Sequence, residues 1–313
     1  MTLFLKEFSH GITRIDTGYL RPGFAASYLL VEAGEAVFIE TGPSHAVPVL
    51  LAALAQKGLT PEAVRAVLVT HVHLDHAGGA GELLRHLPRA ELLVHPRGLR
   101  HLLDPAKLQA GAEAVYGRER FQTLLGGIHP ADPQRTRATA DQEQFLLSGR
   151  ALTLLHTPGH ALHHQCVWDA ASGGLFSGDA WGISYRVFDQ GGDVLLFPAT
   201  TPVQFDLEAS HQTLDRLAAL SPDWIFLTHF DRISFAPRLT ERLHLLLDRF
   251  AALGRAHQHQ RDPAGLTEAL HHLLWAEGSR PASPVTAAVG RDWLAMDCAL
   301  NAQGLQEWLR RLS

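Results

Sequence analysis

The chain has 313 residues, 46% of them apolar and 19% charged, which is enough apolar material for a substantial core in one large or two ordinary domains. A net charge of −5 without a long run of like charge argues against a nucleic-acid or anionic-membrane surface, and two cysteines cannot form a disulfide framework. No apolar stretch is long enough to span a membrane, and the N-terminus lacks the apolar core of a signal peptide, so we expect a cytoplasmic enzyme.

The first third of the chain alternates between strand and helix patterns. The strand patterns are short and apolar, with Gly and Pro between them, and Ser44 is expected to cap the first helix. The alternation predicts a layered α/β domain. Strands are expected at 11–19, 26–32, 36–41, 66–70 and 91–95, and helices at 44–57 and 79–87.

Residues 97–140 interrupt this alternation. They predict two or three short helices followed by a polar loop, which we interpret as a helical insertion over the mouth of an active site. Beyond it, strands are expected at 145–155, 164–169, 174–177 and 223–228, and helices at 207–220, 238–253, 265–277 and 304–312. We therefore expect a catalytic domain over 1–235 and a helical C-terminal extension over 236–313 that packs on the core.

Four residues of metal-ligand type lie within six positions directly after the apolar strand 66–70: His71, His73, Asp75 and His76. So many polar side chains next to a core are costly unless they are paired or bound to a metal. Zinc accepts imidazole nitrogen and carboxylate oxygen, and a His-rich set with one or two carboxylates is usual for catalytic zinc.

Three further candidates also follow predicted strands. His160 comes after a strand and a Pro-Gly turn, Asp179 follows strand 174–177, and His229 follows strand 223–228. Because every candidate lies at the C-terminal end of a strand, all of them can lie along one edge of the core.

The motif HVHLDH, followed in order by Gly-His, Gly-Asp and Thr-His, resembles the metallo-β-lactamase superfamily between Glu40 and His229. The resemblance implies an αββα sandwich with the metals at one edge. It further implies that His71, His73 and His160 bind one metal ion, that Asp75, His76 and His229 bind a second, and that Asp179 bridges the two.

The pattern is closer to the glyoxalase II type than to antibiotic-degrading members with Cys at the bridging position. It departs from many members at Glu40, where Asp is common. That carboxylate usually orients the metal-binding loop, and Glu can do so with one more methylene.

The resemblance implies a hydrolase with two zinc ions per chain, iron or manganese being the alternatives, and a metal-bridging hydroxide that attacks a small ester or thioester. Asp75 is the candidate catalytic residue, as a group that orients the nucleophile or relays its proton. Lactone or phosphodiester cleavage uses the same chemistry and stays open. So does a persulfide dioxygenase type of enzyme, in which His71, His160 and Asp179 hold a single iron.

Other residues are open or are interpreted as structural. His163 and His164 are expected on a strand face or beside the ligands, and Trp181, Tyr185 and Arg186 either line the substrate pocket or pack within their loop. Cys166 and Cys298 are expected to be buried, whereas His101, His271 and His272 are expected on helix surfaces. Gly78, Gly79 and Gly81 are interpreted as positions of close chain packing and not as a phosphate-binding loop, since the Lys of such a loop is missing.

Overall fold

The computed structural model describes residues 4–260, 262–279 and 285–312, which divide into two compact units. Unit 1 contains segments 1–156, 163–178 and 223–232, and unit 2 contains segments 157–162, 179–222 and 233–313. The chain passes from one unit to the other several times. Each unit is described by itself below.

The first sheet of unit 1 has seven strands in the sequence order β1 to β7. Strands β1 to β4 are antiparallel neighbours, and β4 to β7 are parallel neighbours. The carboxyl ends of β4 and β5 therefore lie at the same edge of the sheet. The strands are β1 (Leu5–Glu7), β2 (Ile12–Asp16), β3 (Ala26–Glu32), β4 (Glu35–Ile39), β5 (Val64–Leu68), β6 (Glu91–Val94) and β7 (Thr136–Ala138).

The second sheet has the order β13-β12-β11-β10-β9-β8, in which β8 to β11 are antiparallel and β11 and β12 are parallel. Strand β13 is the place where the chain leaves unit 1 for unit 2. The strands are β8 (Glu143–Leu147), β9 (Arg150–His156), β10 (Gln165–Asp169), β11 (Gly174–Gly178), β12 (Trp224–Leu227) and β13 (Arg232–Ser234).

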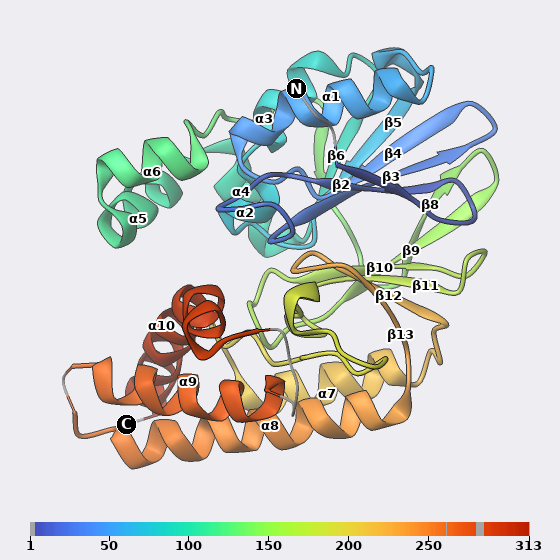
Figure 1. Ribbon diagram of the computed structural model, residues 1–313. Coiled ribbons are helices and arrows are strands. Elements are labelled where there is room, and N and C mark those ends of the chain that lie inside the picture. Colours follow the sequence, from blue (N-terminus) through green and yellow to red (C-terminus); the bar gives the residue numbers. More distant parts are fainter. Residues whose placement is uncertain (1–3, 261, 280–284, 313) are drawn as a thin grey trace. The chain divides into compact units, whose positions relative to one another are not determined.

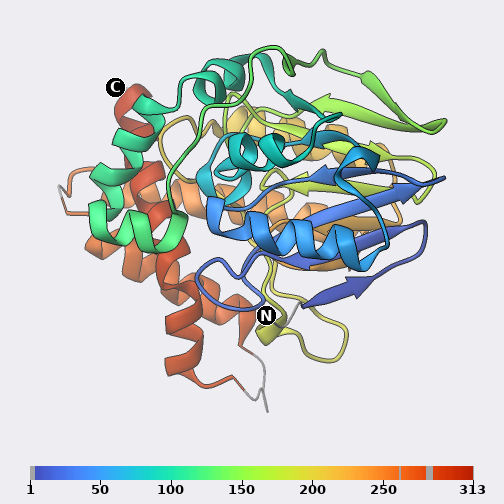
Figure 2. The ribbon, with the colours of Figure 1, turned by 90° about the horizontal axis from the view of Figure 1, so that it is seen from above.

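Two apolar cores show that unit 1 is layered. One core joins the face of the first sheet, including Phe38 and Val67, to helix residues such as Leu50 and Leu83. The other fills the space between the two sheets with residues such as Tyr28 and Phe226. Figures 1 and 2 show helix α1 lying over the blue strands of the first sheet.

The helices of unit 1 are mostly short. They are η1 (Ser44–Ala46), α1 (Val47–Gln56), η2 (Pro61–Ala63), α2 (Leu74–Ala77), α3 (Ala80–His86), α4 (Pro96–Leu103), α5 (Ala106–Tyr116) and α6 (Arg118–Leu125). The last three correspond to the two or three short helices that the sequence predicts in this part of the chain.

Unit 2 is mainly helical. Its long helices α8, α9 and α10 pack against one another, and α7 packs against α8 (Figure 1). Its helices are η3 (Arg186–Phe188), α7 (Leu207–Ala218), α8 (Pro237–His257), α9 (Ala264–Gly278) and α10 (Ala287–Leu312). Among the residues that the structure describes, no helix is long and apolar enough to cross a membrane.

Several sequence predictions of local structure were wrong. The strand expected at 145–155 is two antiparallel strands, β8 and β9, and the helix expected at 304–312 begins at Ala287. Ser44 does not cap the first helix: Pro48 lies in the first turn of α1, Ala46 precedes it, and the Ser44 hydroxyl instead donates to the Gly78 carbonyl at 3.0 Å. Strand β7 lies where a loop was expected, because its three residues are held by pairing with β6 and not by a pattern of their own. His271 is 6% exposed and not on the surface, since it lies on the face of α9 that also buries Leu270 and Leu274.

Candidate metal centre

Glu40 and His71 follow the parallel neighbours β4 and β5 at one edge of the first sheet. The Glu40 backbone N–H donates to the Leu68 carbonyl at 2.8 Å, so the pairing of the two strands continues into the site. Glu40 has φ 66°, in the left-handed region that residues other than Gly, Asn and Asp seldom adopt. Such a conformation persists only where the surroundings hold it, as they often do at functional sites.

The Glu40 carboxylate is a buried acceptor for three segments of unit 1. It accepts hydrogen bonds from the Thr70 backbone N–H at 3.1 Å, from the Thr70 hydroxyl and from the Thr228 hydroxyl at 3.2 Å. Its Oε1 also lies 2.9 Å from Nδ1 of His76. Glu40 therefore connects the loops that follow β4, β5 and β12.

Three histidines of unit 1 have Nδ1 held by a protein oxygen. Nδ1 of His71 lies 3.0 Å from the Thr70 hydroxyl, Nδ1 of His76 faces Glu40, and Nδ1 of His229 lies 3.0 Å from the Phe24 carbonyl. Because a carbonyl or carboxylate oxygen can only accept, Nδ1 of His76 and of His229 carries the proton. The Thr70 hydroxyl donates to Glu40, so it accepts from His71 in turn. Each ring thus keeps a lone pair on Nε2, the form in which imidazole binds a metal.

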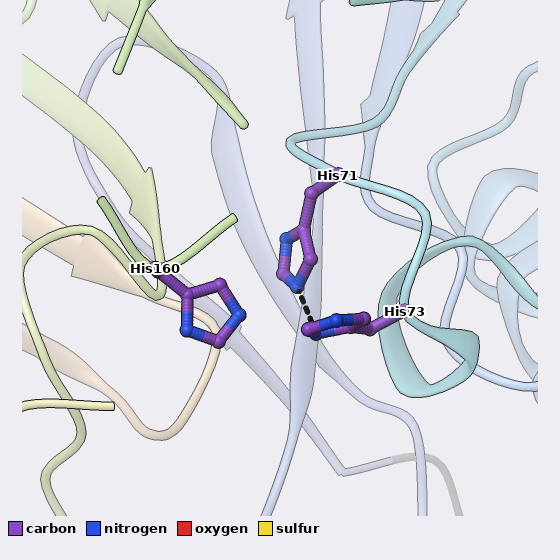
Figure 3. A group of neighbouring side chains, drawn as sticks. All are labelled: His71, His73 and His160. Carbon is purple, nitrogen blue, oxygen red and sulfur yellow. Dashed lines mark hydrogen bonds between the residues drawn. The ribbon is translucent and has the colours of Figure 1, made fainter. Parts of the chain in front are cut away.

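Nε2 of His71 lies 2.9 Å from Nδ1 of His73, the contact marked by the dashed line in Figure 3. Two nitrogens that bind one tetrahedral zinc ion, at about 2.0–2.1 Å each, are separated by roughly 3.3–3.4 Å. A small opening of this pair therefore accommodates one metal ion.

Asp75 is partly exposed to solvent, unlike His76 and His229. Its Oδ2 lies 3.1 Å from Nε2 of His229 and 3.7 Å from Nε2 of His76, and its side chain is 22% exposed whereas His76 is fully buried. A carboxylate oxygen thus faces two ring nitrogens that have lone pairs, which is a favourable arrangement only with a cation or a proton between them.

Two groups of described residues in unit 1 bring their ligand atoms within 4.8 Å of one another: Glu40 with His71 and His76, and Asp75 with His76 and His229. Imidazole nitrogen with carboxylate oxygen is a donor set that suits zinc, iron and manganese. The residues present therefore fit a divalent metal ion.

His160 and Asp179 belong to unit 2, where they lie next to each other. Nε2 of His160 is 3.5 Å from Oδ2 of Asp179, and its Nδ1 is 2.9 Å from the Ala199 carbonyl. His160 is the third residue drawn in Figure 3. Both line a cavity of about 20 Å³ within unit 2, together with Pro158, Ser210 and Leu214.

The turn before His160 requires glycine. Gly159 has φ 141°, and a Cβ at this position would lie 2.6 Å from Cα of Ser210 on α7. Its carbonyl also accepts from the backbone N–H of Asp206, the N-cap residue of α7, at 2.8 Å. The Pro-Gly pair therefore fixes His160 against the start of α7.

Thr70 and Thr228 were given no role in the sequence analysis, although both contact Glu40. Each directly precedes a ligand candidate, so the repeated Thr-His dipeptide was a signal that could have identified them. His163 and His164 also lie at the site: the centre of the His71 ring is 4.9 Å from that of His164 and 6.1 Å from that of His163. Both are buried, which agrees with a position beside the ligands.

The structure favours packing for the residues whose roles were open in unit 2. Trp181 and Tyr185 are fully buried, and the Tyr185 hydroxyl donates to Asp297 at 2.9 Å. Arg186 pairs with Asp189 at 3.2 Å. Cys166 and Cys298 are buried as expected, and burial raises the pKa of the Cys298 thiol, which keeps it protonated and unreactive.

The glycines after the HVHLDH motif are positions of close packing, as interpreted from the sequence. A Cβ on Gly78 would lie 2.3 Å from the Leu74 carbonyl oxygen, and one on Gly81 would lie 2.0 Å from the His129 carbonyl oxygen. Neither contact tolerates a side chain, so these glycines let α2 and α3 follow the motif without displacing it.

The family model for the metallo-beta-lactamase superfamily matches residues 20–229. The chain is 30% identical over 179 residues to a metallo-beta-lactamase fold-containing protein of Sulfurisphaera tokodaii, which covers 56% of this chain and 63% of that protein. It is 30% identical over 161 residues to a hydroxyacylglutathione hydrolase of Salmonella typhi, which covers 50% of this chain and 48% of that protein. The matches thus span between about half and just under two thirds of these relatives.

Solved structures resemble the whole chain. A metallo-beta-lactamase superfamily protein from Sulfolobus tokodaii aligns with a TM-score of 0.65 at 24% identity, covering 96% of this chain and all of that one. A family protein from Thermus thermophilus aligns with a TM-score of 0.66 at 21% identity, covering 99% and 93%. At these identities the likeness shows the fold, an α/β sandwich with a helical C-terminal extension, as predicted.

Proposed function

This chain belongs to the metallo-beta-lactamase superfamily, and from that premise we propose that it is a hydrolase with two zinc ions per chain that cleaves a small ester or thioester. In this proposal residues 1–235 form the catalytic domain and residues 236–313 a helical extension. The protein would act on its small-molecule substrate in the cytoplasm.

One observation carries the proposal: the ring nitrogens and carboxylates of unit 1 are oriented as ligands. Nδ1 of His71, His76 and His229 is held by an oxygen of the protein, so Nε2 keeps its lone pair. Histidines that serve only to pack or to form surface ion pairs have no need of this shared orientation. The second set of contacts, from His71 to His73 and from Asp75 to His229, then brings the ligand atoms together.

The proposed ligand sets follow the family motif residue by residue. His71, His73 and His160 hold one ion, Asp75, His76 and His229 hold the other, and Asp179 contributes to both. Glu40 orients His76 directly and His71 through the Thr70 hydroxyl. Mutation of such outer contacts typically lowers metal affinity by about 10- to 100-fold.

Bound metal ions would supply a water molecule made nucleophilic at neutral pH and a positive charge for the carbonyl oxygen that becomes negative during the attack. The chain's own residues hold the ligands in place and accept the proton that the attacking water loses. Asp75 is suited to accept or relay that proton, because its carboxylate is partly exposed while the ligands around it are buried. Holding the reacting groups in place lowers the entropic cost of the attack.

The ester or thioester class is supported by the relatives. The hydroxyacylglutathione hydrolases of Salmonella typhi and Citrobacter koseri are, by name, enzymes that hydrolyse an acyl derivative of glutathione. Since each match covers only part of the relative, the substrate is a proposal for this chain and the acyl group is not specified.

The first test is the metal content of protein purified without added metal, measured by elemental mass spectrometry beside the His71→Ala variant. We expect about two zinc ions per wild-type chain and fewer in the variant, together with turnover of thioesters or esters in a panel that includes lactones and phosphodiesters. About one iron per chain, with oxygen consumption on persulfides and no hydrolysis, would contradict the proposal.

A further inference from the structure

A second cluster of metal-ligand residues lies in unit 2, on helices α7 and α8, which run side by side (Figure 1). It consists of His211 and Asp215 on α7 and of His244 and Asp248 on α8, so each helix has a His with an Asp four residues later. Residues four apart lie on the same helix face, so each helix presents both side chains to the other.

The two histidines meet nitrogen to nitrogen. Nδ1 of His211 lies 2.6 Å from Nδ1 of His244, and the ring planes are parallel to within 1° with their centres 4.9 Å apart. Since the ring centres are much farther apart than the nitrogens, the rings meet edge to edge. Both Nδ1 atoms are thus directed at one point between the helices.

Each outer nitrogen faces a carboxylate of the opposite helix. Nε2 of His244 lies 3.1 Å from Oδ1 of Asp215, and Nε2 of His211 lies 3.3 Å from Oδ1 of Asp248. An ionised carboxylate only accepts, so each Nε2 carries a proton and each Nδ1 is left with a lone pair. Two lone pairs facing each other at this distance repel unless a cation lies between them.

We propose that His211 and His244 form a zinc-binding site on unit 2, separate from the residues of the proposed catalytic centre. A histidine that binds a metal commonly donates its other N–H to a carboxylate, which fixes the tautomer and orients the ring, and here both histidines have such a partner. The His211 and His244 side chains are 21% and 26% exposed and those of the two Asp residues are mostly exposed, so the ion has access from solvent and water completes its coordination. Bound zinc would link α7 to α8.

The competing occupant of this point is a proton shared between the two Nδ1 atoms, and the experiment distinguishes the two. The full-length protein is equilibrated by dialysis at buffered free zinc concentrations, and bound zinc per chain is counted by elemental mass spectrometry. The variants are His211→Gln, His244→Gln, Asp215→Asn and Asp248→Asn. The matched control is His272→Gln, since His272 is an exposed histidine paired with Glu268 at 3.0 Å on α9.

With zinc supplied in the dialysis, we expect wild type and His272→Gln to bind one zinc ion beyond the two of the proposed catalytic centre, and His211→Gln or His244→Gln to bind only those two. The Asp variants should bind that ion about 10- to 100-fold more weakly. In ¹⁵N NMR spectra of the histidine side chains, zinc should shift the Nδ1 signals of His211 and His244 together. Equal zinc binding by all variants, or a shared Nδ1 proton that zinc does not displace, would overturn the proposal. His71→Ala should lower zinc binding only at the proposed catalytic centre. A failure of the proposed function and a failure of the His211–His244 site therefore give different zinc counts.

Discussion

At the scale of single residues, Glu40 is the position on which the candidate centre of unit 1 depends most. It combines a left-handed backbone with a fully buried carboxylate that contacts Thr70, His76 and Thr228. Every one of these partners donates to it, so the carboxylate cannot be replaced by a group that also donates.

We predict that Glu40→Gln lowers metal affinity by about 10- to 100-fold. The amide N–H₂ of Gln would face at least one N–H or O–H donor that now bonds to the carboxylate, and the His76 ring would lose its fixed orientation. Glu40→Asp should lower metal affinity less than Glu40→Gln does, since Asp keeps the negative charge and adopts the left-handed backbone conformation more readily. Zinc affinity measured by competition with a chelator checks both, with the exposed Glu62→Gln as control. Affinity unchanged in Glu40→Gln would show that Glu40 does not orient the ligands.

Asp179 provides a second test at this scale. We predict that Asp179→Asn reduces hydrolysis by at least about 100-fold, because loss of an outer contact to a metal ligand alone costs about 10- to 100-fold and Asp179 is proposed as a direct ligand of both ions. The control is Asp193→Asn, because Asp193 is also an aspartate of unit 2 but forms an exposed ion pair with Arg238 at 3.2 Å. Turnover and zinc content are measured on the same preparations. Near-wild-type turnover with full zinc content would exclude Asp179 as a ligand of both ions.

At the scale of elements, the start of α4 is sensitive to pH. Nδ1 of His95 caps the helix by accepting from the Arg97 backbone N–H at 3.1 Å. Burial above all, and then His156 and Arg97, lower the pKa of His95 to about 4. In the unfolded chain this pKa is about 6.5, so the folded state binds fewer protons and loses stability as the pH falls from about 6.5 to 4.

We predict that His95→Asn removes the loss of stability at low pH that His95 causes, because Asn does not titrate and is a favourable N-cap residue. Wild type should lose about 2 kcal/mol more of its free energy of unfolding than the variant between pH 7 and pH 5. Urea unfolding at the two pH values measures this, with the exposed His259→Asn as control. If wild type and His95→Asn lose the same amount, His95 is not kept neutral by the fold.

Two helical glycines give opposite predictions for the same substitution. A Cβ on Gly304 of α10 would lie 1.7 Å from the Thr200 carbonyl oxygen, and moving this backbone atom of unit 2 would disturb the structure around it. A Cβ on Gly111 of α5 meets nothing within 4 Å. Gly304→Ala should therefore destabilise by about 1–3 kcal/mol, and Gly111→Ala should stabilise by roughly 0.5–1 kcal/mol. Thermal unfolding of both variants tests the pair. A stabilising Gly304→Ala would mean that α10 does not approach Thr200 this closely.

At the scale of the whole molecule, the proposed ligands come from segments far apart in the chain, at 71–76, 160, 179 and 229. A metal that binds only the folded state stabilises it by about 2.7 kcal/mol at a free concentration 100 times the Kd. We predict that removing metal with a chelator lowers the thermal midpoint and that added zinc restores it. The chelator should have a much smaller effect on His71→Ala. If the chelator lowers the thermal midpoint of wild type and of His71→Ala equally, the stabilising metal is bound at other sites.

Much of the fold could be predicted from the sequence because the relevant signals are local. Buried strands such as β5 read as short apolar runs, the long helices α7 and α8 show helical periodicity, and the insertion interrupts the alternation. Strands of three residues such as β1 and β7 carry too few side chains for a pattern, and pairing with a neighbouring strand decides them.

For the candidate site, the sequence by itself determined the ligand residue types and their places after strands, because metal chemistry accepts few side chains and the HVHLDH spacing is short. Only the tertiary structure showed which oxygen orients each histidine ring. The Phe24 carbonyl that orients His229 lies 205 positions away in the chain, and a backbone carbonyl leaves no trace in residue type. The same holds for His211 and His244, which lie 33 positions apart, because only the packing of α7 on α8 brings their nitrogens together.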